Sequence, residues 1–181
     1  MARAIRITLK RAEEGYDVAA SKLFGAPLVP LDWEDKFAED ILFFGQIRLS
    51  DIAALDTENK LPHTGYLYLF LDTEMYPYMA WAEYYDGEPN LVIDDFNEAE
   101  PQFSHLNQAF LMSFSTEEGD CDGTKLFGKP SFGEHEGELL LQFDPLDNDT
   151  GFLNEVDGYA YFFFGKGRKR IDGIEFFIDH T

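Results

Sequence analysis

Two short blocks of this sequence are nearly identical, although they lie far apart. Residues 21–27 read SKLFGAP and residues 124–130 read TKLFGKP. The blocks LFFGQI and ELLLQF follow them in the same order and align Gln46 with Gln142. A third pair, TGYLYLF and DGYAYFF, comes after these. An ordered series of this kind constrains the fold, because each copy must supply the same succession of turns and strands.

The matched blocks predict a single domain made of two similar strand-rich halves, at about residues 20–72 and 123–165, related by a pseudo-twofold axis. The spacing between matched residues shortens from block to block, as expected if the second half has shorter loops, since loops tolerate deletions. The alternative is that similar strands recur by chance in an aromatic-rich β protein. With 18 Phe, 9 Tyr and 2 Trp among 181 residues, the composition favours a packed core.

Several segments have the pattern of β-strands. Ile5, Ile7 and Leu9 alternate with polar residues, which predicts a strand with one buried face. The segment 41–49 is apolar and rich in β-branched and aromatic residues, which predicts a strand with a short helix after it. Residues 61–72 contain an unbroken apolar run, which predicts a central strand buried on both faces.

Two further segments complete the expected fold, whose class is α+β, mostly β. Residues 76–96 predict a β-hairpin that turns at 86–90, where the sequence DGEPN supplies turn residues. Residues 101–115 predict a helix, because their apolar side chains fit one helical face. The side chains that would share this face are Leu106, Phe110, Leu111 and Phe114.

The charge of the chain narrows the class of partner. Lys and Arg number 14 and Asp and Glu number 35, which gives a net charge of −21. Such a chain repels nucleic acid and anionic membrane surfaces, so a basic protein is the expected partner. The sequence has no signal-peptide core and no long apolar run, which predicts a cytoplasmic protein. Its single cysteine, Cys121, lies among carboxylates that oppose thiolate formation, so it is a poor nucleophile.

The densest acidic stretch, from Glu83 to Glu100, is also aromatic. No Lys or Arg occurs from Leu61 to Thr124. Aromatic side chains anchor a partner while carboxylates attract its cations, so this stretch predicts an interface for a basic protein. The candidate contact residues are Tyr84, Tyr85, Asp86, Asp94, Asp95 and Glu98. The alternative is a solvated face over an ordinary core.

The paired lysines and glutamines of the repeated blocks are candidates for ligand binding. Lys22 and Lys125 each lie beside a glycine turn, where backbone N–H groups and an ammonium can form an anion site. Gln46 and Gln142 each lie within an apolar strand, where a buried amide must find hydrogen-bond partners. The alternative is structural: each ammonium pairs with a nearby carboxylate, and each glutamine ties strands or loops together.

Other polar clusters do not fit a known catalytic or metal-binding pattern. Residues 144–155 are rich in carboxylates but lack the register of an EF-hand, since Asp149 stands where the loop glycine belongs. The four histidines include no His-Glu-x-x-His pair, and no nucleophile elbow or phosphate-binding loop occurs. The basic run GKGRKR at 165–170 is typical of a solvated hairpin turn. The sequence therefore predicts no catalytic residue, metal or cofactor.

The order of the blocks also resembles a known family. Ser-Lys-Leu-x-Gly-x-Pro, Gln-Ile-x-Leu and Leu-Pro-x-x-Gly-x-Leu-x-x-Phe are followed by Lys-Leu-x-Gly-x-Pro, Leu-Leu-Leu-Gln and Gly-x-x-Tyr-Phe-Phe. Over roughly residues 20–165 this series resembles the YwqG-like family of bacterial proteins. The resemblance implies a single, mostly β domain in a family without an established activity. Some members of that family resemble immunity partners encoded beside secreted toxins.

Two functions remain open from the sequence. The first is a non-enzymatic cytoplasmic binding protein with an acidic, aromatic surface for a basic partner, such as a toxin in the immunity sense. The second is a small-ligand or metal-binding protein, or an enzyme, with a site between the two halves that includes Lys22 and Lys125. We favour the first, because the charge distribution indicates a basic partner and the sequence contains no catalytic motif.

Overall fold

The computed structural model describes residues 3–98, 100–116, 118–167 and 170–180. Within these residues the chain forms one ten-stranded antiparallel sheet and a small two-stranded sheet. The mostly β prediction is thus confirmed, whereas the helical part of the expected α+β class amounts, in the described residues, to short 3-10 segments. None of these is long and apolar enough to cross a membrane. They are η1 (Leu31–Trp33), η2 (Leu49–Asp51), η3 (Phe96–Glu98) and η4 (Pro101–Asn107).

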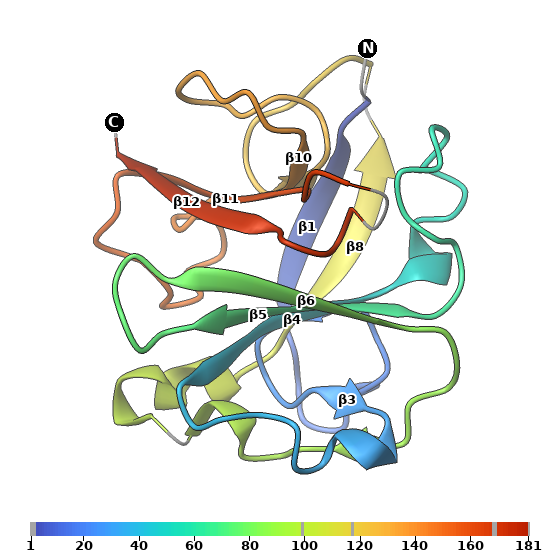
Figure 1. Cartoon of the computed structure of the whole chain (residues 1–181), viewed down its shortest axis with the longest axis vertical. Helices are drawn as coiled ribbons and strands as arrows, with labels where there is room; N and C mark the ends of the chain where they lie inside the picture. Colours follow the sequence, from blue (N-terminus) through green and yellow to red (C-terminus); the bar gives the residue numbers. More distant parts are fainter. Residues whose placement is uncertain (1–2, 99, 117, 168–169, 181) are drawn as a thin grey trace.

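The strands of the large sheet are β1 (Ile5–Arg11), β2 (Lys22–Leu23), β4 (Ile41–Arg48), β5 (Tyr66–Asp72), β6 (Met79–Tyr85), β8 (Phe110–Thr116), β9 (Lys125–Leu126), β10 (Leu139–Phe143), β11 (Gly158–Phe163) and β12 (Glu175–His180). Their order in the sheet is β12-β11-β10-β9-β1-β8-β2-β4-β5-β6. In Figure 1, β11 and β12 lie above β4, β5 and β6, and β1 and β8 run between the two groups. The end strands β6 and β12 lie against each other without forming a ladder, so the sheet nearly closes on itself.

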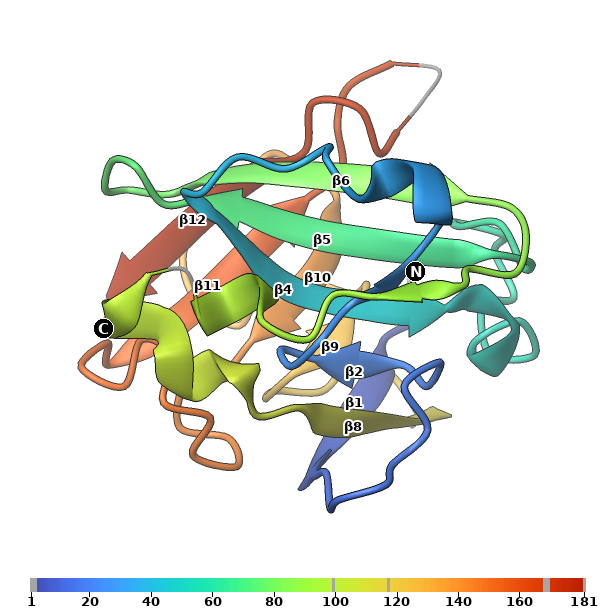
Figure 2. The same cartoon turned by 90° about the horizontal axis from the view of Figure 1, so that it is seen from below.

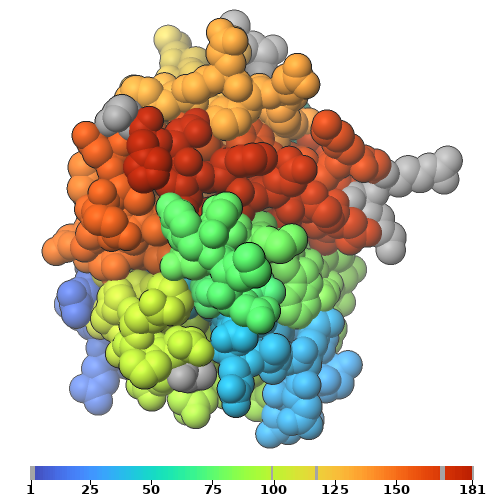
Figure 3. Space-filling view, turned by 60° about the vertical axis from the view of Figure 1, so that its left-hand side comes forward, coloured from blue at the N-terminus to red at the C-terminus, as the bar shows by residue number. Residues whose placement is uncertain are grey.

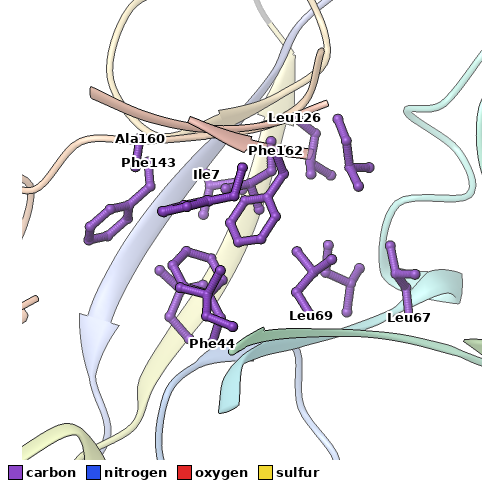
Figure 4. Packing of buried hydrophobic residues seen from close by; sticks show 14 of the residues in the cluster. Ile7, Phe44, Leu67, Leu69, Leu126, Phe143, Ala160 and Phe162 are labelled. Carbon is purple, nitrogen blue, oxygen red and sulfur yellow. The ribbon is translucent and has the colours of Figure 1, made fainter. Parts of the chain in front are cut away.

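The space enclosed by the sheet holds the main hydrophobic core (Figure 4). Its centre is aromatic: the ring of Phe44 on β4 lies 4.8 Å from that of Phe162 on β11 and 5.6 Å from that of Phe143 on β10. Ile7 of β1 and Leu126 of β9 are buried in the same cluster. Because side chains from both ends of the strand order meet here, the core holds the two groups of strands together.

Two smaller aromatic clusters lie on the outer faces of the sheet. Tyr68 and Phe70 of β5 are fully buried on one outer face, in a cluster with side chains from residues 28–39 and 88–98. Figure 2 shows these two segments lying over β5 and β4. Within this cover, β3 (Leu28–Val29) pairs with β7 (Leu91–Val92). On the other outer face, Tyr161 of β11 is fully buried and bonds to the backbone of Phe132.

The three strands predicted in the first part of the chain are confirmed. They are β1, whose Ile5, Ile7 and Leu9 are buried, then β4, and then β5, which is buried from Tyr66 to Leu71. The short helix expected after β4 is the 3-10 segment η2.

The hairpin predicted over 76–96 is wrong. Its first strand, β6, pairs with β5, and its second strand, β7, pairs with β3 instead of β6. The chain leaves the sheet after Tyr85 and crosses the outer face of β4 and β5. The aromatic side chains on that face require a cover, and residues 88–98 supply part of it.

The helix predicted over 101–115 is also wrong. A 3-10 segment ends at Asn107, and residues 110–116 form strand β8, which pairs with β1 and β2. The apolar spacing fits a helix, but the same residues also alternate with Ser113 and Ser115, which are exposed. The period of two prevails because β1 and β2 offer the backbone partners that a strand needs.

Candidate functional site

The structure places each repeated lysine opposite a repeated glutamine. Lys22 on β2 is the cross-strand neighbour of Gln46 on β4, and Lys125 on β9 is the neighbour of Gln142 on β10. All four side chains are buried, with exposed fractions of 0 to 1%. The two blocks therefore build two small polar units that are buried within the sheet.

The KLFG turn has the same conformation in both blocks. Phe24 and Phe127 have φ values of 57° and 62°, in the left-handed region that bulky residues avoid. Burial of both rings in the main core offsets this strain. The next residue is a glycine at positive φ in each block, and a Cβ on Gly25 would lie 2.5 Å from the Cβ of Ala109. The motif is thus a tight turn that the packing enforces.

Each glutamine ties its KLFG loop to the sheet. Gln46 accepts a hydrogen bond from the Leu28 N–H at 3.0 Å and donates to the carbonyls of Val18 and Ala20, both at 3.0 Å. Gln142 accepts from the Ser131 N–H at 2.9 Å and donates to the Gly123 carbonyl at 2.8 Å and to Ser131 Oγ at 2.9 Å. Since both side-chain amides bond to their own loops, the geometry favours the structural interpretation of these glutamines.

The two lysines differ in what surrounds the ammonium. Lys125 Nζ lies 2.8 Å from Asp120 Oδ1 and 2.6 Å from each of the carbonyl oxygens of Cys121 and Lys129. Lys22 Nζ donates to the Val18 carbonyl at 3.0 Å and lies 5.1 Å from the centre of the Tyr16 ring. Burial lowers the pKa of Lys22 to about 8, although the charge of Asp17 opposes the shift.

The structure does not bring Lys22 and Lys125 together. Strands β1 and β8 lie between β9 and β2 in the sheet, and each ammonium bonds to carbonyl oxygens of its own loop. No cavity found among the described residues is lined by both lysines. A single anion site that uses both is therefore absent from the described part of the chain.

The six residues of the predicted interface do not form one surface. Tyr84 and Tyr85 are adjacent on β6 and point to opposite faces: Tyr84 packs against the main core, and Tyr85 lies 6.2 Å from Trp33 on the outer face. Asp86 is exposed beside them and accepts a hydrogen bond from Thr64 Oγ1 at 3.0 Å.

The other three acidic candidates lie farther along the outer face. Asp94, Asp95 and Glu98 are exposed on the segment that covers β4 and β5. Asp95 and Glu98 line a groove of about 450 Å³, here called the Phe96 groove. Its floor and rim are made of Glu34, Phe37, Ala38, Glu39, Ile41, Ile93, Asp95, Phe96 and Glu98. The two segments that form it lie next to each other at the bottom of Figure 3, in light blue and yellow-green.

Asn97, a residue that the sequence analysis missed, fixes this acidic segment to the sheet. Its side chain accepts from the Phe43 N–H at 2.9 Å and donates to the carbonyls of Phe43 and Leu106 at 3.1 and 3.0 Å. Strand β2 pairs with β4 only at Gly45 and Gln46, and at Phe43 the amide of Asn97 takes the place of a strand neighbour. The signal in the sequence was a single amide among carboxylates, which is weak.

We expect Asn97→Ala to lower the free energy of unfolding by about 2 kcal/mol, because it leaves buried backbone groups of Phe43 and Leu106 without partners. Urea denaturation measures this change. Asn90→Ala is the control, since Asn90 is exposed and its side chain accepts a hydrogen bond from the Leu31 N–H at 3.0 Å, which the substitution removes without touching the buried groups of β4. Equal losses in the two variants would contradict the anchoring role of Asn97.

Two larger cavities lie elsewhere. One of about 740 Å³, here called the Phe177 groove, runs along the outer face of β12 and the 134–138 segment. Another, of about 480 Å³, lies between residues 60–62, strand β6 and the turn at Arg170 to Asp172. The carboxylate of Glu138 bridges the side chains of Lys60 and Arg170 beside these two cavities.

The remaining polar clusters have structural partners or fall outside the described residues. In the 144–155 segment, Asp144 accepts from the Leu146 N–H at 3.0 Å. The described residues contain no group of three His, Cys, Asp or Glu side chains arranged to hold a metal ion. The basic run at 165–170 lies partly outside the described residues, at 168–169. No protein-family model, curated protein or solved structure matches this chain.

Proposed function

We propose that this chain is a non-enzymatic binding protein that holds a basic protein partner on its acidic outer surface. The observation that carries the proposal is the Phe96 groove. Four carboxylates, from Glu34, Glu39, Asp95 and Glu98, surround a floor of apolar side chains. A lysine or arginine side chain has matching chemistry, because its alkyl stem covers apolar surface while its charged head meets carboxylates.

The net charge of −21 supports the same proposal on the scale of the whole molecule. A strongly negative surface attracts a basic partner over a distance of about a Debye length and raises the rate of encounter. Charge complementarity then favours basic partners over acidic ones. Of the two candidate tyrosines, Tyr85 contributes by supporting the cover beneath the groove, since it packs in the aromatic cluster on that outer face.

The resemblance of residues 20–165 to the YwqG-like family supports a narrower form of this proposal. In that form the chain works in the cytoplasm as an immunity-type protein, and the basic partner is a toxin. A basic toxin would present Lys and Arg side chains to its partner, so the narrower form requires the same groove chemistry.

We further propose that the chain is an internal duplication with pseudo-twofold symmetry. Support comes from the strand order. If β1, β2, β4, β5 and β6 are exchanged with β8, β9, β10, β11 and β12 in turn, the new order is the old one read backwards. Support also comes from matching bonds: the Arg48 N–H donates to Ser21 Oγ at 2.9 Å, as the Asp144 N–H donates to Thr124 Oγ1 at 3.1 Å.

A second candidate function, small-ligand binding between the two halves, is favoured by the cavity of about 480 Å³. Its wall combines Leu61, Leu67 and Tyr84, from the part of the chain that contains β1 to β6, with Arg170 and Ile171, from the part that contains β8 to β12. An apolar cavity with a few polar groups is the usual form of a small-molecule site. Lys22 and Lys125 are not among the residues that line it.

The proposed function is tested with a hexalysine peptide as the basic probe and two matched charge-reversal variants. We expect Asp95→Lys/Glu98→Lys to weaken peptide binding about tenfold and to reduce its dependence on salt, because two groove carboxylates become ammonium groups. Glu13→Lys/Glu14→Lys makes the same change of charge at exposed residues outside the grooves and should weaken binding less than threefold. Equal losses would mean that net charge alone attracts the peptide, and the proposal would fail.

A further inference from the structure

One half of the molecule already binds an ammonium group on its outer face, and the group comes from its own chain. Lys36 Nζ lies 3.0 Å from Glu83 Oε1 and stands 4.8 Å above the Trp33 ring and 5.9 Å from the Trp81 ring. Trp81 and Glu83 are two residues apart on β6, so they share its outer face. An aromatic ring and a carboxylate on one edge strand, together with the ring of Trp33 from η1, thus form a lysine site.

The other edge strand carries the same two side-chain types in the reverse order. On β6, Glu83 lies opposite Tyr68 of β5. On β12, Phe177 lies opposite Tyr161 of β11, and Glu175 lies opposite Phe163. Glu175 and Phe177 are both exposed, whereas Phe176 between them is buried in the main core. The outer face of β12 therefore presents a carboxylate and a ring two residues apart, as the outer face of β6 does.

These two side chains line the Phe177 groove, whose volume is about 740 Å³. Phe177 is 42% exposed, and the rings of His135 and Phe163 lie 5.8 and 5.7 Å from it. Glu134 and Glu136 add carboxylates to the rim. The groove therefore combines an accessible ring with carboxylates, and a carboxylate with aromatic rings also holds Lys36 on the outer face of β6.

The cations that line the groove leave this ring and carboxylate accessible. Arg170 bonds to Glu138 and stacks on the inner ring Phe164, with its guanidinium 4.1 Å from the ring centre. Lys166 is exposed at the rim. Among the described residues, no Lys or Arg stands over Phe177 or pairs with Glu175.

We propose that the Phe177 groove is a second binding site, which takes a lysine or arginine side chain of a basic partner in the way that Lys36 occupies its site on β6. Phe177 supplies the ring, and Glu175 supplies the carboxylate. An aromatic face attracts a cation within about 6 Å of the ring centre, and a carboxylate in reach adds a charge-assisted hydrogen bond. The inference deepens the proposed function and depends on it only for the positive charge of the partner.

The test is a titration of the whole protein with hexalysine peptide, followed through backbone amide signals in NMR spectra. Gly137 and Gly173 report on the Phe177 groove, and Ile93 and Phe96 report on the other groove. We expect both sets to shift in the unchanged protein. In Glu175→Gln/Phe177→Ser, binding at Gly137 and Gly173 should weaken at least fivefold, with unchanged affinity at Ile93 and Phe96.

Two controls make the outcome decisive. Leu146→Ser removes an exposed apolar side chain outside the groove and should leave both sites unchanged. Glu175→Lys alters one exposed side chain only, and it serves as the second variant if the double substitution disturbs the amide spectrum. Shifts at Gly137 and Gly173 that persist at the original affinity in the groove variants would overturn the inference.

The two proposals fail in different ways. If only Ile93 and Phe96 respond to the peptide, the Phe177 groove is not a site, and the proposed function stands on the Phe96 groove. If only Gly137 and Gly173 respond, the second groove is a site and the Phe96 groove is not. If neither set responds, both proposals are overturned.

Discussion

Asp120→Ala should lower the free energy of unfolding by about 3 kcal/mol, because it leaves the buried ammonium of Lys125 without its carboxylate. The substitution also removes the acceptor for the N–H groups of Cys121 and Lys129, each bonded to Asp120 at 2.8 Å. Urea denaturation of the folded protein at neutral pH measures the loss.

Two further variants separate the charge effect from a general disturbance of the loop. Asp120→Ala/Lys125→Met should recover most of the lost stability, since replacing both members of a buried ion pair with apolar groups is often neutral. Asp17→Ala, at the matching position before Lys22, should cost under about 1 kcal/mol, because its side chain is 64% exposed and pairs with Arg48 at the surface. A double variant no more stable than Asp120→Ala would disprove the pairing argument.

The free energy of unfolding of the unchanged protein, minus that of Lys22→Met, should increase by about 2 to 3 kcal/mol between pH 7 and pH 10. Burial lowers the pKa of Lys22 from 10.5 in the unfolded chain to about 8 in the folded one. The unfolded chain therefore binds more protons between these two pKa values, so raising the pH through this window favours the folded state. Below pH 8 the folded state carries the full cost of a buried ammonium.

The comparison with Lys22→Met separates the contribution of the Lys22 ammonium from that of other groups that titrate at alkaline pH. Burial raises the pKa of Tyr161 to about 12 and raises that of Tyr68 also, so the buried tyrosines lower stability as the pH rises above 10. Their contribution is common to both proteins and cancels in the difference. If the difference in free energy of unfolding between the two proteins does not change from pH 7 to pH 10, burial does not lower the pKa of Lys22 in the folded state.

Single strands could be predicted from the sequence, because each is specified by residues that are adjacent in the chain. Alternation over Ile5 to Leu9 and the apolar run from Tyr66 to Leu71 gave correct strands, because burial on one or both faces leaves a local pattern. The partners of strands could not be predicted in the same way. Leu91 and Val92 pair with a segment some sixty positions earlier, and nothing in their own composition specifies that partner.

The candidate site was predicted in part. The ordered blocks singled out Lys22, Gln46, Lys125 and Gln142, and the strand registers join these residues into two pairs, Lys22 with Gln46 and Lys125 with Gln142. The predicted acidic interface grouped Tyr84 with Tyr85, although adjacent residues of a strand point to opposite faces. The Phe177 groove was missed because its parts, at 134–138 and 163–177, are joined only by folding.

The contact between β6 and β12 also bears on how the molecule behaves when it is crowded by copies of itself. An edge strand carries unpaired N–H and C=O groups that can template a strand of another chain. Here the two edges of one long sheet lie against each other, so each hides part of the other's free backbone. Near-closure of the sheet thus works as protection against edge-to-edge aggregation, obtained without a covering helix.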